Sequence, residues 1–244
     1  MVKDYSFVSR NRQTYRHMTH RPLYALAMVG PLLAFYHAFA ARYPTGLLAP
    51  AYMRGVLEFF GVTGQYVACA AVLTVLFLQH LAHRDPWKIH GRVVAGITAE
   101  SFAWTVPLWV IGQVTGRLDL RGAASAGTEP EAFQKVLMAI GAGIYEEFIF
   151  RLALISVLML IMVDILGLRK DTCAVISALL AAVLFSLCHF PGDQVWGPDP
   201  LPWGRFVFLA LAGILWGAIF VFRGFAVAVG SHIVWDLYVF FWRA

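Results

Sequence analysis

Charged residues are scarce in this sequence. Asp, Glu, Lys and Arg make up only 14% of its 244 residues, whereas hydrophobic residues make up 60%, and the mean hydropathy is +0.69. A soluble domain carries about 25% charged residues, so this composition excludes an ordinary soluble domain and favours a lipid bilayer. Because a membrane span needs about 20 mostly apolar residues, the chain has room for roughly seven spans with short loops.

Cysteine is also rare, and the motifs of several protein classes are missing. Cys69, Cys173 and Cys188 form no CxxC pair and no regular spacing, which excludes a disulfide framework and a zinc knuckle. The HExxH pattern of many metalloproteases does not occur. The formal net charge of +5 comes from basic residues between apolar runs, so it indicates membrane topology rather than a nucleic-acid partner. We expect no cofactor and no metal.

Seven apolar runs have the length of a membrane span, and they predict an all-α polytopic bundle of about seven transmembrane helices. The runs cover about 23–41, 61–82, 93–114, 136–166, 173–190, 205–222 and 225–242. The fourth run is too long for one perpendicular crossing. It is therefore tilted or kinked, or it is broken near Glu146 to Arg151, which would give eight helices. We expect a single transmembrane domain over residues 23–244, preceded by a basic segment over residues 1–22.

The distribution of Lys and Arg between the connections predicts the orientation, because cytoplasmic loops carry the excess. One side holds eleven: five in the N-terminal segment, then Arg84, Lys88, Arg92, Arg169, Lys170 and Arg223. The other side holds six: Arg42, Arg54, Arg117, Arg121, Arg205 and Arg243. We therefore expect a cytoplasmic N-terminus and an outer C-terminus, unless a break in the fourth run inverts everything after it.

Two of the expected outer loops, 115–132 and 190–204, are long and rich in turn residues. The second reads FPGDQVWGPDPLPWG and combines seven prolines or glycines with two tryptophans. It is either a lid over a site or an interfacial loop with an aromatic belt.

Ionisable residues inside the apolar runs are the candidate functional residues, because a charge in hydrocarbon needs a partner or a water-filled cavity. In the fourth run, Glu147 and Arg151 are four residues apart with the carboxylate first, which favours an ion pair on one helix face. Glu146 points about 100° away from Glu147, so it is free to face a cavity. The alternative is that all three residues form a buried charge network that only holds helices together.

Two later runs add histidines. Phe185 and His189 are four residues apart near the outer end of the fifth run, and His232 and Asp236 are four apart within the seventh. A carboxylate at that spacing can accept a hydrogen bond from the imidazole and fix its tautomer. One carboxylate and two histidines at comparable depth on three helices can build a site that activates water. Glu100 in the third run either faces the same cavity or holds helices together.

The ordered set EExxxR, FxxxH and HxxxD resembles the motifs of the CAAX protease and bacteriocin-processing (CPBP) family of intramembrane glutamic proteases. The resemblance covers about residues 130–242, the expected catalytic core, and a sorting-protease (myxosortase-like) branch fits the outward-facing site. It implies that Glu146 and His189 activate the attacking water, and that His232 and Asp236 form or support the oxyanion site. Glu147, Arg151 and Phe185 then support these groups.

The resemblance also implies what the chain acts on and where. The expected activity is that of an endopeptidase, which cleaves near the C-terminus of a membrane-associated, prenylated or otherwise anchored protein. The expected location is the bacterial inner membrane, with the lipid bilayer and a protein or peptide substrate as partners. The sequence departs from the family at Asp236, because the members that process prenylated proteins have asparagine there. Asparagine can donate a hydrogen bond to an oxyanion, whereas an ionised aspartate cannot.

Two other functions stay open on the residues alone. Glu146, His189, His232 and Asp236 are acceptable zinc ligands, so a zinc-dependent membrane protease is one alternative. A non-catalytic membrane binding or immunity protein is the other. A cysteine protease is disfavoured, because Cys188 and His189 are adjacent and diverge by about 100° on a helix.

Overall fold

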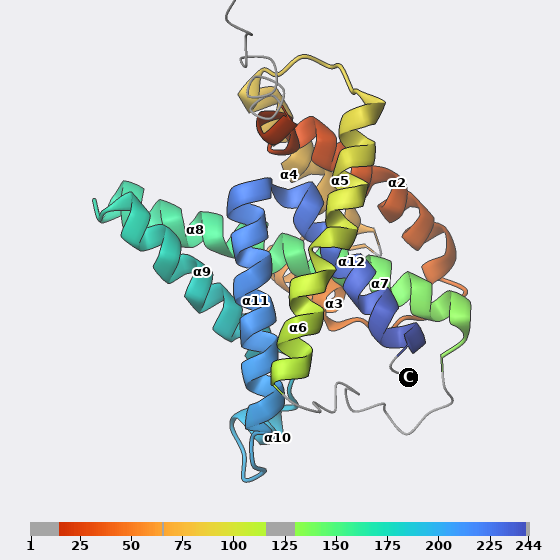
Figure 1. Ribbon diagram of the computed structural model, residues 1–244, viewed down its shortest axis with the longest axis vertical. Helices are drawn as coiled ribbons and strands as arrows, with labels where there is room; N and C mark the ends of the chain where they lie inside the picture. Colours follow the sequence, from red (N-terminus) through yellow and green to blue (C-terminus); the bar gives the residue numbers. More distant parts are fainter. Residues whose placement is uncertain (1–14, 65, 116–129, 243–244) are drawn as a thin grey trace, which may run out of the picture.

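The computed structural model describes residues 15–64, 66–115 and 130–242, and these residues form a helical membrane bundle (Figure 1). The expected all-α polytopic fold is confirmed. Within the described residues, six helices are long and apolar enough to cross a membrane: Pro22–Ala40, Gly91–Val114, Ala132–Ile165, Lys170–Leu187, Trp203–Arg223 and Phe225–Trp242. A shorter apolar helix covers Val67–His83. Each of the seven predicted runs therefore corresponds to one of these helices.

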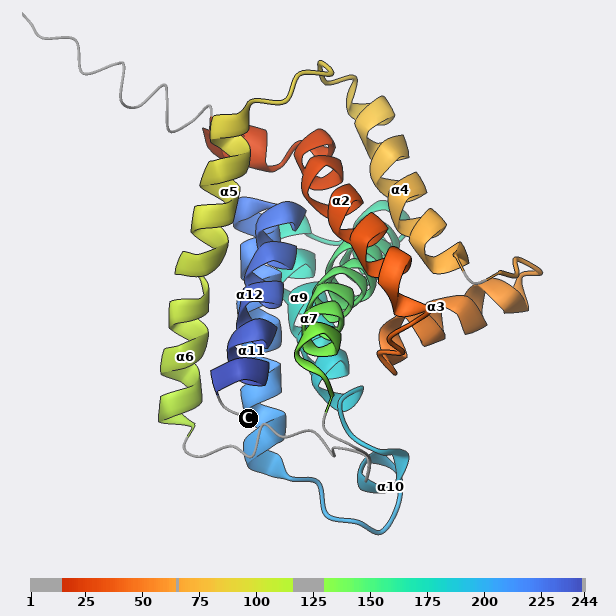
Figure 2. The same cartoon turned by 90° about the vertical axis from the view of Figure 1, so that its right-hand side faces the viewer.

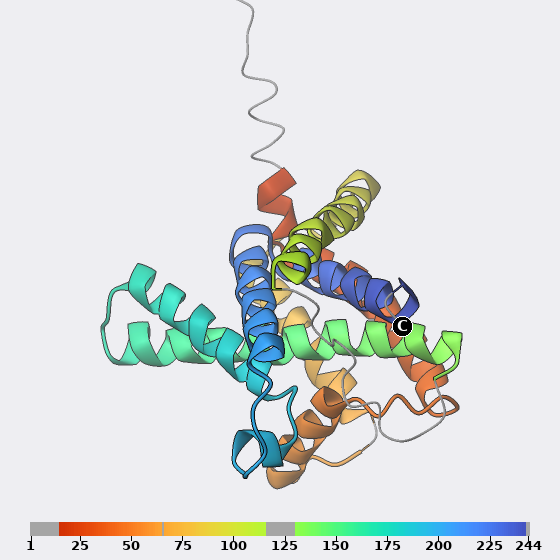
Figure 3. The ribbon, with the colours of Figure 1, turned by 60° about the horizontal axis from the view of Figure 1, so that its bottom comes forward.

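The fourth run forms one continuous helix of 34 residues, so the alternative of a break near Glu146 to Arg151 is wrong and the expectation of a single long helix holds. It begins with α7 (Ala132–Glu147) and continues through η1 (Phe148–Ile155), α8 (Ser156–Met159) and η2 (Leu160–Ile165), where η1 and η2 are wider π-helical turns. At about 1.5 Å per residue it is longer than the hydrocarbon core is thick, so it must tilt. Figure 3 shows it crosswise to α11 (Trp203–Arg223).

Two features of the helices were not predicted. The segment between the first two spans contains α3 (Leu48–Phe59), which links α2 (Pro22–Ala40) to α4 (Val67–His83). The third span is divided at Trp104 into α5 (Gly91–Ala103) and α6 (Thr105–Val114). Pro107 explains the division, because proline has no N–H to donate to the carbonyl four residues earlier.

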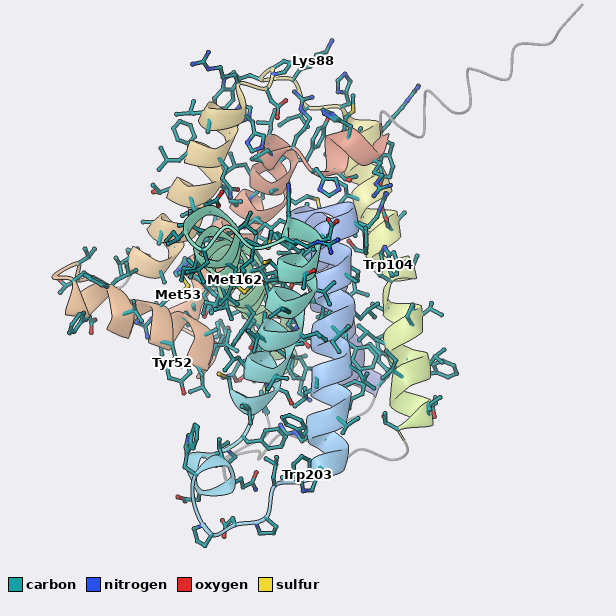
Figure 4. All side chains as sticks on the ribbon, turned by 90° about the vertical axis from the view of Figure 1, so that its left-hand side faces the viewer. Tyr52, Met53, Lys88, Trp104, Met162 and Trp203 are labelled. Atoms are coloured by element: carbon teal, nitrogen blue, oxygen red, sulfur yellow. The ribbon has the colours of Figure 1, made fainter. Side chains whose placement is uncertain are left out.

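The ends of the bundle can be named after Lys88 and Trp203, which lie at opposite ends of the molecule (Figure 4). At the Lys88 end the chain before α2 meets the connection between α4 and α5 and the end of α11. Arg21 Nε lies 3.1 Å from Asp85 Oδ1, and the His20 ring is hydrogen-bonded to the Phe222 carbonyl. At the Trp203 end lie α10 (Gly192–Val195), the end of α6 and the end of α12 (Phe225–Trp242) (Figure 2).

The structure describes most of one expected outer loop and little of the other. Residues 116–129, which make up most of the first loop, lie outside the described residues, as do residues 1–14 of the basic N-terminal segment. The second loop contains α10, and its tryptophans are exposed, Trp196 to 88% and Trp203 to 68%. In this structure the loop therefore displays its aromatic rings as an interfacial loop would, and does not fold them over the bundle.

Small residues bring the helices that carry the ionisable cluster close together. A Cβ atom on Gly213 of α11 would lie 2.9 Å from the Cα atom of Ala182 on α9 (Lys170–Leu187). A Cβ atom on Gly143 of α7 would lie 2.5 Å from Ile233 Cγ1 and 3.0 Å from its backbone nitrogen on α12. Both glycines are therefore required by close helix contacts, as is usual in membrane bundles.

Gly213 and its neighbour Gly217 provide a matched test of this packing. Gly213→Ala should lower the thermal unfolding midpoint, because the new methyl group meets backbone atoms that cannot move aside. Gly217→Ala, on the same buried side of α11, should leave it unchanged or raise it, because the only close atom is Ala178 Cβ at 3.7 Å and alanine favours the helix. Equal midpoints for the two variants, measured in detergent micelles by circular dichroism, would contradict the close contact.

Candidate active site

The ionisable residues singled out in three separate motifs come together around one carboxylate oxygen. Glu146, near the end of α7, has its Oε2 atom 3.6 Å from His189 Nε2 and 3.8 Å from His232 Nε2. His189 follows the end of α9, and His232 lies in the middle of α12. Among the described residues, Glu146 Oε2 has no hydrogen-bond partner, although the atom is shielded from solvent. Separations of this size suit polar atoms that share a bridging water.

Both histidines present Nε2 to Glu146 because their Nδ1 atoms are engaged elsewhere. His189 Nδ1 lies 2.7 Å from the carbonyl oxygen of Phe185. A carbonyl oxygen can only accept, so this nitrogen carries the hydrogen and donates it. His232 Nδ1 lies 2.8 Å from Glu147 Oε1, a carboxylate oxygen that also accepts. In their neutral forms, both rings therefore offer an unprotonated Nε2 to the Glu146 carboxylate.

Glu147 and Arg151 form a fully buried ion pair next to this cluster. Arg151 NH1 lies 3.1 Å from Glu147 Oε1, and the exposed fractions of the two side chains are 1% and 0%. Arg151 NH2 also donates to the backbone carbonyl of Gly213 at 3.3 Å. The ion pair predicted from the spacing is thus present. The side chain of Glu146 is 16% exposed and that of Glu147 is fully buried, so Glu146 is the accessible one of the two carboxylates.

Aromatic rings enclose the pair and its histidine. The Arg151 guanidinium lies 4.4 Å from the centre of the Phe185 ring, which agrees with a supporting place for Phe185. Trp216, on α11, stacks on the His232 ring with 3.9 Å between centroids and 13° between planes. The sequence reasoning missed Trp216. Its only signal was a large aromatic residue between Gly213 and Gly217 in a span, which indicates ordinary packing equally well.

Asp236 lies at the edge of the cluster and not in the place expected for it. Its Oδ2 atom is 3.7 Å from His232 Nε2, beyond hydrogen-bonding distance. The carboxylate that fixes the His232 tautomer through Nδ1 is that of Glu147. Asp236 therefore faces the same ring nitrogen of His232 as Glu146 does.

Glu100 belongs to a different cluster, so the structure favours the helix-packing alternative for it. Its carboxylate accepts hydrogen bonds from the Trp104 indole at 3.1 Å, from the Tyr15 hydroxyl at 2.9 Å and from the Arg223 guanidinium. These contacts join α5 to α11 and to the chain before α2. Burial and the Glu100 carboxylate raise the pKa of Tyr15 to about 12, so Tyr15 stays a neutral donor.

The other nucleophile and ligand chemistries have less support in the described residues. No group of three or more His, Cys, Asp or Glu side chains in residues 15–64, 66–115 and 130–242 is arranged to hold a metal ion. Partial burial and the charge of Glu146 raise the pKa of the Cys188 thiol, which disfavours the thiolate that a cysteine protease needs.

A comparison with known protein families agrees with this geometry. The family model of the type II CAAX prenyl endopeptidases, Rce1-like, matches residues 128–238, which include all three motifs and the whole ionisable cluster. This part of the chain is similar to that family. Similarity to this family implies intramembrane protease activity, and the apolar helices indicate an integral membrane protein. The match gives no support to the sorting-protease branch. No curated protein and no solved structure was found to match the chain.

The buried ion pair of the protease should respond non-additively to substitution. Arg151→Met leaves the Glu147 carboxylate buried without its cation, and Glu147→Gln leaves the guanidinium without its anion. We expect each change to lower the free energy of unfolding by about 3–5 kcal/mol. The double variant should lose clearly less than the sum of the two, because neither charge then remains. Denaturant unfolding in micelles measures these values, and strictly additive losses would show that the two charges do not depend on each other.

Proposed function

We propose that this chain is an endopeptidase of the membrane interior, in which Glu146 and His189 activate the attacking water. The proposal rests chiefly on Glu146 Oε2, a shielded carboxylate oxygen without a hydrogen-bond partner among the described residues, which faces the Nε2 atoms of two histidines. A water between these atoms donates one hydrogen bond to the carboxylate and one to the neutral Nε2 of His189. Two acceptors on one water increase its nucleophilicity and direct its remaining lone pair.

The bond changes follow from this arrangement. The water oxygen attacks the carbonyl carbon of the scissile peptide while its proton moves to Glu146. The carbonyl oxygen becomes an oxyanion, and His232 stabilises it in the imidazolium form, donating through Nε2 while Nδ1 still donates to Glu147. When the carbon–nitrogen bond breaks, Glu146 returns the proton to the departing amine. The products are a carboxylic acid, which keeps the second proton of the water, and an amine. The acid then passes that proton to the amine through solvent, which gives a carboxylate and an ammonium group, and Glu146 is again a carboxylate.

Asp236 supports this step best in its protonated form. An ionised carboxylate beside the oxyanion would repel it, whereas a carboxylic acid can donate a hydrogen bond to it. Its Oδ2 atom lies close enough to His232 Nε2 for both groups to reach one oxyanion. A protonated Asp236 would thus do what asparagine does in the members that process prenylated proteins.

The substrate class follows from the family and from the surroundings of the site. The matched family is named for its action on CAAX prenyl proteins, and the site of this chain lies among membrane helices. We propose a substrate that is itself held at the membrane, by a prenyl group or another anchor, and that is cut near its C-terminus. A zinc-dependent protease with the same residues is distinguished by strong chelators, which should leave the activity unchanged.

The first test of this proposal compares the C-termini of membrane proteins in cells that contain the wild type or a variant. Glu146→Gln keeps the shape of the side chain but removes the base. The rate at which cleaved C-termini form should therefore fall by about 10²–10⁴-fold. His189→Gln should act in the same direction. The control is Glu58→Gln, because Glu58 is an exposed carboxylate on α3. Quantitative mass spectrometry of C-terminal peptides measures the effect, and unchanged C-termini in folded Glu146→Gln protein would refute the proposal.

We also propose that the chain lies in a bacterial inner membrane with its N-terminus in the cytoplasm and its site open to the outer side. The bias of Lys and Arg towards one set of connections supports this orientation. His189 follows α9 on the side of α10, and therefore lies towards the Trp203 end of the bundle (Figure 2). In this orientation the Trp203 end faces outward.

Labelling of single cysteines tests the orientation. In a background with the three natural cysteines replaced by serine, Val195→Cys should react with a membrane-impermeant maleimide added to intact cells. Lys88→Cys, at the opposite end, should react only after the membrane is opened. Position 125, in the other long loop, lies outside the described residues and serves as a second outer probe. The reverse labelling pattern would place the site on the cytoplasmic side.

A further inference from the structure

The helix α3 lies at the edge of the bundle and is too short to cross a membrane. Its 12 residues span about 18 Å, whereas the hydrocarbon core is about 30 Å thick. It runs crosswise to α5 and α6 (Figure 2), and Met53 is buried against the bundle while Tyr52 is 58% exposed (Figure 4). Val56 and Phe59 are exposed to 60% and 83%. A short helix with one apolar face outward is typical of the membrane interface.

A pocket of about 250 Å³ lies behind this helix, between α2, α3, the start of α4 and α7. Hydrogen-bonding side chains contribute much of its wall, and they are Tyr36, His37, Thr45, Arg54, Tyr66 and Tyr145. His37 Nε2 is hydrogen-bonded to the Tyr145 hydroxyl at 2.7 Å. The pocket is therefore lined by one permanent cation and several groups that can donate hydrogen bonds, in a region bordered by lipid.

Arg54 has no counter-charge in this pocket. No Asp or Glu is among the lining residues, and in the part of the chain that the structure describes Arg54 forms no ion pair. Glu58 lies one turn further along α3, but among the described residues it forms no ion pair with Arg54. A guanidinium that is partly buried next to lipid is unfavourable without an anion. Its fork of N–H groups matches the oxygens of a phosphate.

We infer that this pocket binds the phosphate of an anionic phospholipid headgroup. Arg54 pairs with the phosphate, Tyr66 and the His37–Tyr145 pair supply further hydrogen bonds, and the acyl chains lie along the exposed apolar face of α3. A lipid fits better than a soluble anion because α3 brings hydrocarbon to the edge of the pocket. The site lies largely outside residues 128–238, so it does not come from the part of the chain that matches the protease family. It also does not depend on the proposed catalysis.

Tyr145 links the lipid pocket to the active site. Tyr145 precedes Glu146 on α7, and its hydroxyl is held by His37 of α2. A bound headgroup would tie α2 and α3 to the turn of α7 that carries the catalytic carboxylate. The lipid would thus stabilise the arrangement of helices on which the site is built.

The test compares two arginines on the same side of the molecule. Purified wild type, Arg54→Gln and Arg42→Gln are titrated with phosphatidylglycerol in detergent micelles, and bound lipid is counted by native mass spectrometry. Arg42 is exposed and does not line the pocket, so Arg42→Gln removes the same charge and should bind as wild type does. Arg54→Gln should weaken binding by about tenfold or more, because it loses charge-assisted hydrogen bonds.

Further probes separate the possible occupants and guard against a misfolded variant. Arg54→Lys keeps the charge but not the fork, so its affinity should lie between those of wild type and Arg54→Gln. Phosphatidylcholine should bind more weakly than phosphatidylglycerol, and inorganic phosphate alone should not compete with the lipid. Equal lipid binding by Arg54→Gln and Arg42→Gln would overturn the inference. Competition by inorganic phosphate as strong as that by the lipid would also overturn it. The same holds if Arg54→Gln leaves lipid binding unchanged and weakens only the binding of a peptide with a free C-terminal carboxylate.

Discussion

The buried ion pair between Glu147 and Arg151 is the interaction on which the rest of the site depends. An isolated charge at this depth would be unfavourable by several kcal/mol, and the two charges compensate each other at 3.1 Å. The pair also reaches outward in two directions. Arg151 donates to the Gly213 carbonyl on α11, and Glu147 accepts from His232 on α12. One buried pair on the long helix therefore fixes the positions of two other helices.

Two adjacent carboxylates acquire different roles because successive side chains on a helix diverge by about 100°. Glu147 points into the protein, where it forms an ion pair with Arg151 and accepts a hydrogen bond from His232. Glu146 points towards the histidines, where one of its oxygens makes no hydrogen bond with any described residue. Within a single helical turn, Glu147 thus stabilises the structure and Glu146 remains available for the proposed chemistry. Trp216 keeps the His232 ring in its plane while Glu147 holds its edge.

Sequence reasoning reached the features that arise within one helix. Hydropathy gave the seven apolar helices, and the i, i+4 spacing gave the pair of Glu147 with Arg151. Features that arise between helices were out of its reach. Nothing in the HxxxD motif shows that Glu147, and not Asp236, accepts the hydrogen of His232 Nδ1, because that depends on how α7 and α12 cross. The short helix α3 was missed for another reason, since its 12 residues are too few for a span and include Arg54, Gly55 and Glu58.

The protonation of the two histidines tests the account most directly. It requires His189 and His232 to carry a hydrogen on Nδ1, so that Nε2 of each faces Glu146. Nitrogen NMR of the protein with ¹⁵N-labelled histidine, assigned with His189→Gln and His232→Gln, reports which ring nitrogen is protonated. The account predicts a protonated Nδ1 in both rings near neutral pH, and a loss of that preference for His232 in Glu147→Gln. A neutral ring protonated only on Nε2, in either histidine, would contradict it.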